Sequence, residues 1–173
     1  MELHRMVTQP QLTLYVSSAV RKPPRTIHGY EYHFVAVKPE QFFGLTQVWI
    51  TKQQAVTVSD RERTIADGLR HPQYAGGVPE VAKALWMSRS DINIPRLLEY
   101  TQRFKSGVLT RRVGYLLELY KMASPEQLAQ LRTALSSTYD RLDPTLPKAG
   151  PYQAHWRLQL NVESEELEAI RHT

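Results

Sequence analysis

Apolar and polar residues alternate along the first third of the chain, the pattern of strands that bury one face. The alternation is regular from Leu12 to Val16. The segment 30–37 is rich in aromatic and β-branched residues and places Tyr30, Tyr32 and Phe34 on one face. Two further strands, joined by a polar hairpin loop at 52–54, are predicted over 45–51 and 55–58.

The pattern becomes helical after Ser59, where apolar residues begin to recur at the spacing of a helix face. Proline, glycine and capping residues divide this part of the chain into segments. Helices are predicted from Ser59 to His71, Pro79 to Trp86, Asn93 to Phe104, Val108 to Met122 and Ser124 to Leu135. The segment from Val108 to Met122 is the most apolar, and we expect it to be the central helix of the core.

Two helix ends are assigned from particular residues. Ser59 and Glu62 match a capping box, in which each side chain bonds the backbone N–H of the other residue. Gly107 lies just beyond the helix that ends near Phe104, where a left-handed cap is expected. These assignments predict where the first helix begins and where the third one stops.

The last part of the chain returns to a strand pattern. The Pro- and Gly-rich stretch 143–151 predicts a loop, and Trp156 to Val162 predicts a strand. The order predicts an α+β fold, with an N-terminal, mostly antiparallel sheet, a helical bundle packed on one face and a closing C-terminal strand. We expect one domain over residues 1–162 and an acidic helical or frayed tail over 163–173.

Composition excludes several classes of protein. The 173 residues, 42% of them hydrophobic, are enough to build a core. The chain has no cysteine, which excludes disulfides, thiolate catalysis and cysteine-bound zinc. It has neither an apolar run of about 18 residues nor the leader of a secreted protein. We therefore expect no membrane partner and a cytoplasmic location.

The chain also lacks the common catalytic and cofactor motifs. Its six histidines form neither an H-x-H nor an H-E-x-x-H pair, so we expect no metal site. The glycine pair Gly76-Gly77 is not followed by the Lys-Ser or Lys-Thr of a phosphate-binding loop. No G-x-S-x-G elbow is present. We expect neither a cofactor nor catalytic activity.

A group of carboxylates in the first predicted helix leaves an enzymatic alternative open. Asp60 and Asp67 share a helix face, and with Glu62 they could bind Mg²⁺ as in a metal-dependent nuclease. The structural interpretation is that Asp60 and Glu62 complement the positive end of the helix dipole. Arg63, four residues before Asp67, can pair with it.

Basic residues give the clearest functional signal, in a chain of net charge +5. Arg103 and Lys105 close one predicted helix, where cations are favourable. Arg111 and Arg112 begin the next helix, where cations oppose its dipole. We therefore expect Arg111 and Arg112 to face an external anion or an acidic partner.

A second group of cations extends this predicted surface. Arg21, Lys22 and Arg25 flank two prolines in a loop. Together with the cations at the helix ends, they predict a surface for DNA, RNA or an acidic partner, with phosphate contacts that position a nucleic acid without reading its bases. The alternative is a solvated charged face without a partner.

An ordered set of short motifs resembles the C-terminal domain of AbiEi-type antitoxins and transcriptional regulators. The most specific parts are D-R-E-R-T at 60–64 and A-G-G at 75–77. The others are V-T-V-S at 56–59, A-D-G-L at 66–69, Pro72, Glu80-Val81, Gly29 to Phe34, Phe43-Gly44, Gly114 to Leu119, Leu142 to Pro144, Trp156 and Asn161-Val162. The likeness extends over roughly residues 10–165.

The resemblance implies a non-catalytic antitoxin of a type IV toxin–antitoxin system, which also acts as a DNA-binding transcriptional regulator. The toxin of such a system is a nucleotidyltransferase-like protein, opposed without evident direct contact. The family's N-terminal winged helix-turn-helix has no room before Leu12, so we expect this chain to match the C-terminal domain alone. A nuclease-like enzyme and a protein-interaction domain without nucleic-acid binding remain as alternatives.

Overall fold

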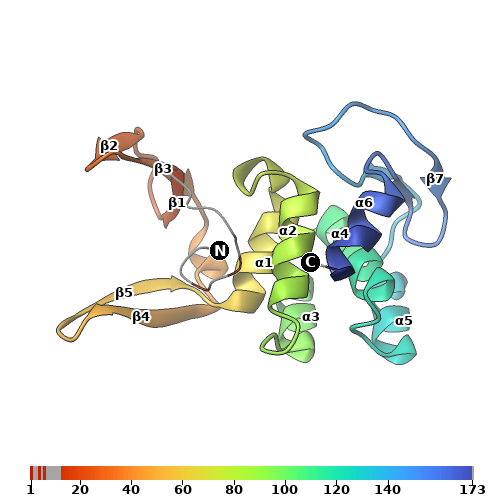
Figure 1. Ribbon diagram of the computed structural model, residues 1–173, viewed down its shortest axis with the longest axis horizontal. Helices are drawn as coiled ribbons and strands as arrows, with labels where there is room; N and C mark the ends of the chain where they lie inside the picture. The colour runs from red at the N-terminus through yellow and green to blue at the C-terminus, as the bar shows by residue number, and fades with distance from the viewer. Residues whose placement is uncertain (2–3, 5, 7–12, 173) are drawn as a thin grey trace.

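The chain folds as the α+β protein that its sequence predicts. The computed structural model describes residues 1, 4, 6 and 13–172, so Leu12 and Thr173 lie outside the described residues. Strands come first, helices follow, and short strands return near the C-terminus. In Figure 1 the helices occupy the centre, the first strands project from one side, and the loop that carries β7 extends on the other.

The first sheet contains β1 (Thr13–Ser18), β2 (Arg25–Ile27) and β3 (Tyr30–Ala36). The middle strand, β3, runs parallel to β1 and antiparallel to β2. His28 and Gly29 connect β2 to β3 with positive φ angles of 51° and 83°, the backbone geometry of a type I′ hairpin. The antiparallel pairing that we expect is present in this hairpin, and β1 adds a parallel pair.

A separate antiparallel hairpin is formed by β4 (Leu45–Thr51) and β5 (Gln54–Ser59), close to the predicted strand bounds. It projects away from the helices in Figure 1. Trp49, 65% exposed, shows how little of this hairpin is buried. The N-terminal strands therefore form two small sheets that stand at the edge of the helical body.

The helices pack mainly on one another and make the core. Their bounds are α1 (Arg61–Arg70), α2 (Val78–Met87), α3 (Ile94–Arg103), α4 (Gly107–Leu119), α5 (Pro125–Thr133) and α6 (Ser164–Ala169). Short 3₁₀ turns are η2 (Pro39–Gln41), η3 (Pro72–Tyr74) and η4 (Ile170–His172). Helix α4 is the central one, as predicted: Leu109, Val113, Leu116 and Leu117 are fully buried.

Two of the expected helix ends are wrong. Ser59 is the last residue of β5, paired with Leu45, and Asp60 caps α1 by accepting a bond of 2.7 Å from the N–H of Arg63. Gly107 does not end α3 but begins α4, after a left-handed Lys105 with φ of 50°. At Ser59 the strand pairing displaces the cap by one residue. At Gly107 the cap of the next helix, Ser106, which accepts the N–H of Leu109, places the glycine inside α4.

The C-terminal sheet places β8 (Leu158–Gln159) between β6 (Asp140–Arg141) and β7 (Tyr152–Gln153). The strand expected over Trp156 to Val162 is thus present but much shorter. Trp156 is fully buried against α4, where a Cβ added to Gly114 would lie 2.1 Å from the indole ring. Glycine at 114 is therefore required by the close approach of this side chain.

The predicted acidic tail forms α6 and packs on the helical body. Leu167 is fully buried, and its carbonyl accepts a bond of 3.0 Å from the hydroxyl of Tyr120. Among the described residues, no helix combines the length and the apolar character that crossing a membrane requires.

Candidate nucleic-acid interface

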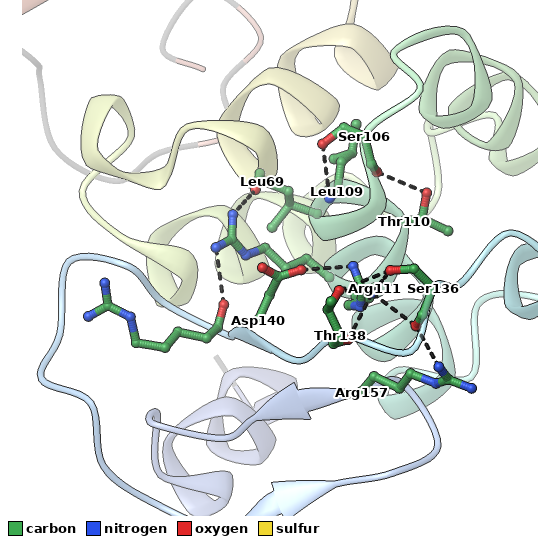
Figure 2. A network of polar contacts seen from close by, with 11 residues as sticks. Leu69, Ser106, Leu109, Thr110, Arg111, Ser136, Thr138, Asp140 and Arg157 are labelled. Atoms are coloured by element: carbon green, nitrogen blue, oxygen red, sulfur yellow. Dashed lines mark hydrogen bonds and ion pairs between the residues drawn. The ribbon is translucent and has the colours of Figure 1, made fainter.

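Arg111 does not lie on an exposed basic face, which corrects the expectation from the sequence. Its side chain is 2% exposed, and one terminal nitrogen donates to Asp140 at 2.8 Å. The other donates to the carbonyl and side-chain oxygens of Ser136 and Thr138 at 2.8–3.2 Å. Figure 2 shows these bonds gathering the segment after α5 around one guanidinium. Arg111 is a structural anchor.

Arg112 is also buried, at 4% exposure, and the expectation for it is wrong in the same way. It donates to the carbonyl of Leu69 at 2.7 Å and to that of Arg141 at 3.1 Å. Leu69 lies in the last turn of α1, so the cation complements the negative end of that helix dipole. Burial lowers the pKa of Arg112 to about 10, while the nearby carboxylates of Asp140 and Asp143 act to raise it. Arg112 therefore stays charged at neutral pH.

A third buried arginine, Arg63, forms the centre of a cluster of cations and aromatic rings. Its guanidinium carbon lies 4.4 Å from the ring centroid of Phe43 and 4.5 Å from that of Phe104. Arg103 lies 3.9 Å from the Phe43 centroid, and Arg70 lies 4.7 Å from the Phe104 centroid. We call these five residues the arginine–phenylalanine cluster.

The bonds of Arg63 explain why the cluster forms. Its Nε donates to Asp67 at 2.7 Å, and a terminal nitrogen donates to the carbonyls of Gln41 and Phe43 at 2.7 and 3.1 Å. These bonds attach the segment after η2 to α1 and bring Phe43 over the helices. Burial raises the pKa of Asp67, and the bond with Arg63 opposes that rise.

The outer edge of the cluster is cationic and open to solvent. The side chain of Arg103 is 46% exposed, Arg70 is half-buried, and Lys105 is exposed just beyond α3. The nearest carboxylate to Arg103 is that of Glu99, at 3.8 Å. Lys105 also lines a groove of about 310 Å³ between the start of α4 and α5. Arg103 and Lys105 are thus exposed, and their contact with an anion stays a prediction.

Arg21 and Lys22, in the loop between β1 and β2, and Arg25, on β2, lie apart from this edge, and all three are exposed. A chain of ring contacts connects the two regions. Tyr74, which follows α1 in η3, is 5.6 Å from the ring of His71 and 4.6 Å from that of Tyr15 on β1. The structure therefore keeps five of the predicted cations on the surface, in two groups.

The carboxylates of the nuclease alternative each have a structural partner. Asp60 caps α1 and accepts a bond from the hydroxyl of Tyr100 at 2.8 Å. Glu62, 4% exposed, accepts the N–H of Asn93 at 2.6 Å. Asp67 accepts from Arg63. Across the described residues, no group of three or more His, Asp or Glu side chains is placed to hold a metal ion.

The aromatic members of the interface were missed in the sequence. Phe43 and Phe104 lie far apart along the chain, and no local pattern predicts that they meet. One signal was present: Arg63 and Arg70 are seven residues apart, so they share a face of α1. Comparison with protein-family models, curated proteins and solved structures finds no match for this chain.

Proposed function

We propose that this chain is a non-catalytic antitoxin or transcriptional-regulator domain that binds nucleic acid through its exposed cations. The observation that carries the proposal is the arginine–phenylalanine cluster, whose open edge presents Arg103 beside Lys105. The ring of Phe43 holds the guanidinium of Arg103 in place, so less side-chain freedom is lost when it meets a phosphate. The likeness to AbiEi-type antitoxins supports a regulatory role in the cytoplasm, opposite a nucleotidyltransferase-like toxin.

The buried polar groups support the non-catalytic part of the proposal. Asp60, Glu62 and Asp67 each accept hydrogen bonds from neighbouring backbone or side chains, which accounts for their presence without a catalytic role. The bonds of Asp60 and Glu62 hold the start of α1 to α3, and that of Asp67 orients Arg63 within α1. This gives each carboxylate a structural role, so the nuclease alternative gains nothing from its geometry.

Charge reversal tests the proposal. The double variant Arg103→Glu with Lys105→Glu is expected to weaken binding to a short labelled DNA duplex by tenfold or more, because two attractive phosphate contacts become repulsive. Fluorescence anisotropy at fixed salt measures the affinity. The matched control is Lys121→Glu with Lys148→Glu, which makes the same change of net charge at exposed positions outside the cluster.

The antitoxin role is tested in cells. Co-expression with the nucleotidyltransferase-like gene of the same locus is expected to restore growth, and the control variant is expected to protect equally well. If the Arg103/Lys105 variant binds DNA and protects as well as the unchanged protein, the assigned interface is wrong.

A further inference from the structure

The first sheet has one face that points away from the helical body. Residues paired across a sheet share a face, and Tyr32 pairs with Leu14 on one side and with Arg25 on the other. Tyr30 pairs with Ile27, and Phe34 pairs with Val16. We call this set the outer face: Leu14, Val16, Arg25, Ile27, Tyr30, Tyr32 and Phe34. Tyr30, Val16 and Ile27 are 40%, 36% and 45% exposed, and Arg25 is exposed as well, whereas Leu14, Tyr32 and Phe34 are half-buried, so the face is partly open to solvent.

The opposite face of the same sheet meets the body. Tyr15 stacks on Tyr74, with ring centroids 4.6 Å apart, and also contacts His33 at 5.5 Å. Tyr15 and His33 are paired in register, and both alternate with the residues of the outer face. In Figure 1 the sheet stands clear of the helices, at the end where β2 is drawn.

The outer face carries a row of rings along its middle strand. Tyr30, Tyr32 and Phe34 occupy alternate positions of β3, so their rings follow one another at about 7 Å intervals. A row of this kind gives successive flat apolar surfaces on which planar groups can stack.

Charge around the outer face favours an anion. Arg25 lies on the face beside Tyr32, and Nζ of Lys22 lies 5.6 Å from the ring centroid of Phe34. Arg21 precedes Lys22 in the same exposed loop. The one carboxylate of residues 13–37 belongs to Glu31, which lies on the opposite face and pairs with His33 at 3.5 Å. The ligand should therefore combine planar apolar rings with negative charge.

We propose that the outer face binds single-stranded nucleic acid, with unpaired bases stacked on Tyr30, Tyr32 and Phe34 and phosphates held by Lys22 and Arg25. Base rings are accessible for stacking only when the strand is unpaired, since a duplex presents base edges in its grooves. This inference rests on the proposed function and adds the class of nucleic acid that the first sheet takes.

The test is fluorescence anisotropy with labelled oligo(U), oligo(dT) and a DNA duplex, titrated with the intact chain over a range of salt. The unchanged protein is expected to bind a single strand more tightly than duplex. Tyr30→Leu with Tyr32→Leu keeps apolar side chains but removes two stacking rings, and it is expected to weaken single-strand binding by about tenfold for each ring. Tyr152→Leu, an exposed ring on the C-terminal sheet, is the matched control.

A second variant tests the phosphate contacts. In the variant Lys22→Ala with Arg25→Ala, affinity is expected to depend less steeply on salt. The negative slope of log affinity against log salt should become shallower by about 0.7 for each phosphate that is no longer neutralised. Binding to either oligonucleotide supports the proposal, and the ratio of the two affinities identifies the preferred sugar. Circular dichroism spectra matching those of the unchanged protein establish that the variants fold.

Three results would overturn the proposal. The first is equal single-strand affinity of the Tyr30/Tyr32 variant and the unchanged protein. The second is binding to anionic phospholipid vesicles but to no oligonucleotide. The third is burial of the outer face in a dimer, seen as a shift to monomer in sedimentation of the Tyr30/Tyr32 variant. If duplex binding through Arg103 and Lys105 persists while single strands do not bind, this inference fails and the proposed function stands.

Discussion

Replacing Arg111 with methionine is expected to destabilise the fold without weakening nucleic-acid binding. Methionine retains much of the apolar length of the side chain but none of its donors. The change leaves the carbonyl of Thr138 without its guanidinium partner and removes the 2.8 Å ion pair with Asp140. The carbonyl of Ser136 loses Arg111 but keeps a bond of 2.6 Å from Arg157.

The magnitude follows from the bonds that are lost and from the exposure of their acceptors. Each bond to a charged donor contributes about 1.5–3 kcal/mol. Ser136 and Thr138 are exposed, so each lost bond counts at the lower end of this range. Asp140 keeps a side-chain exposure of 38%, so water rehydrates it and the ion pair adds little to the cost. Removing the unpaired buried Nε of Arg111 offsets part of the loss. We expect the free energy of unfolding to fall by about 3 kcal/mol, the sum of roughly two such bonds.

Urea denaturation followed by circular dichroism measures this change, and the melting temperature should fall by about 6–12 °C. Lys148→Met is the matched control, since it removes one exposed cation outside the assigned interface and should change stability by less than about 0.5 kcal/mol. If Arg111→Met is as stable as the control and instead loses affinity for nucleic acid, Arg111 is a binding residue and its structural role is refuted.

Three further changes test other parts of the account. Gly114→Ala should lower the free energy of unfolding by about 3 kcal/mol or more, because the new methyl group meets Trp156 at 2.1 Å; thermal denaturation measures it. Burial lowers the pKa of His71, so the folded state favours the neutral ring. The free energy of unfolding is therefore highest above pH 6.5 and decreases as the pH falls from 6.5 through the lowered pKa. His71→Gln should flatten the pH dependence of the unfolding free energy in that window, and an unchanged profile would contradict this. Asp143→Asn weakens the acceptor that bonds the N–H of Val78 at 2.5 Å at the start of α2, and chemical denaturation should show a loss of about 1–2 kcal/mol.

Local signals predicted most of the helices. Pro79 lies in the first turn of α2, Asn93 accepts the N–H of Arg96 at the start of α3, and Ser124 caps α5, where it forms a capping box with Gln127. Each of these signals depends on residues within one turn, so a single sequence contains all the information needed. The α+β class follows from the order of these elements.

Longer-range contacts were beyond the reach of the sequence. The dipole argument for Arg112 considered only its own helix, whereas its partners Leu69 and Arg141 lie 43 and 29 residues away. Arg112 lies in the first half of α4, toward the positive end of that helix dipole, but its guanidinium reaches the C-terminal end of α1, where the dipole is negative. Arg63 was paired correctly with Asp67, but nothing in the local pattern placed Phe43 and Phe104 over it.

The salt dependence of nucleic-acid binding tests the central claim most directly. Affinity of the unchanged chain for a labelled DNA duplex, measured across a salt series, is expected to fall linearly on a log–log plot with a slope near −0.9 for each phosphate contact. If Arg103 and Lys105 each contact a phosphate, the slope should have a magnitude of at least about 1.8. That magnitude should decrease in the Arg103→Glu/Lys105→Glu variant. A chain that binds no nucleic acid at low salt, or whose slope does not change in that variant, would contradict the account.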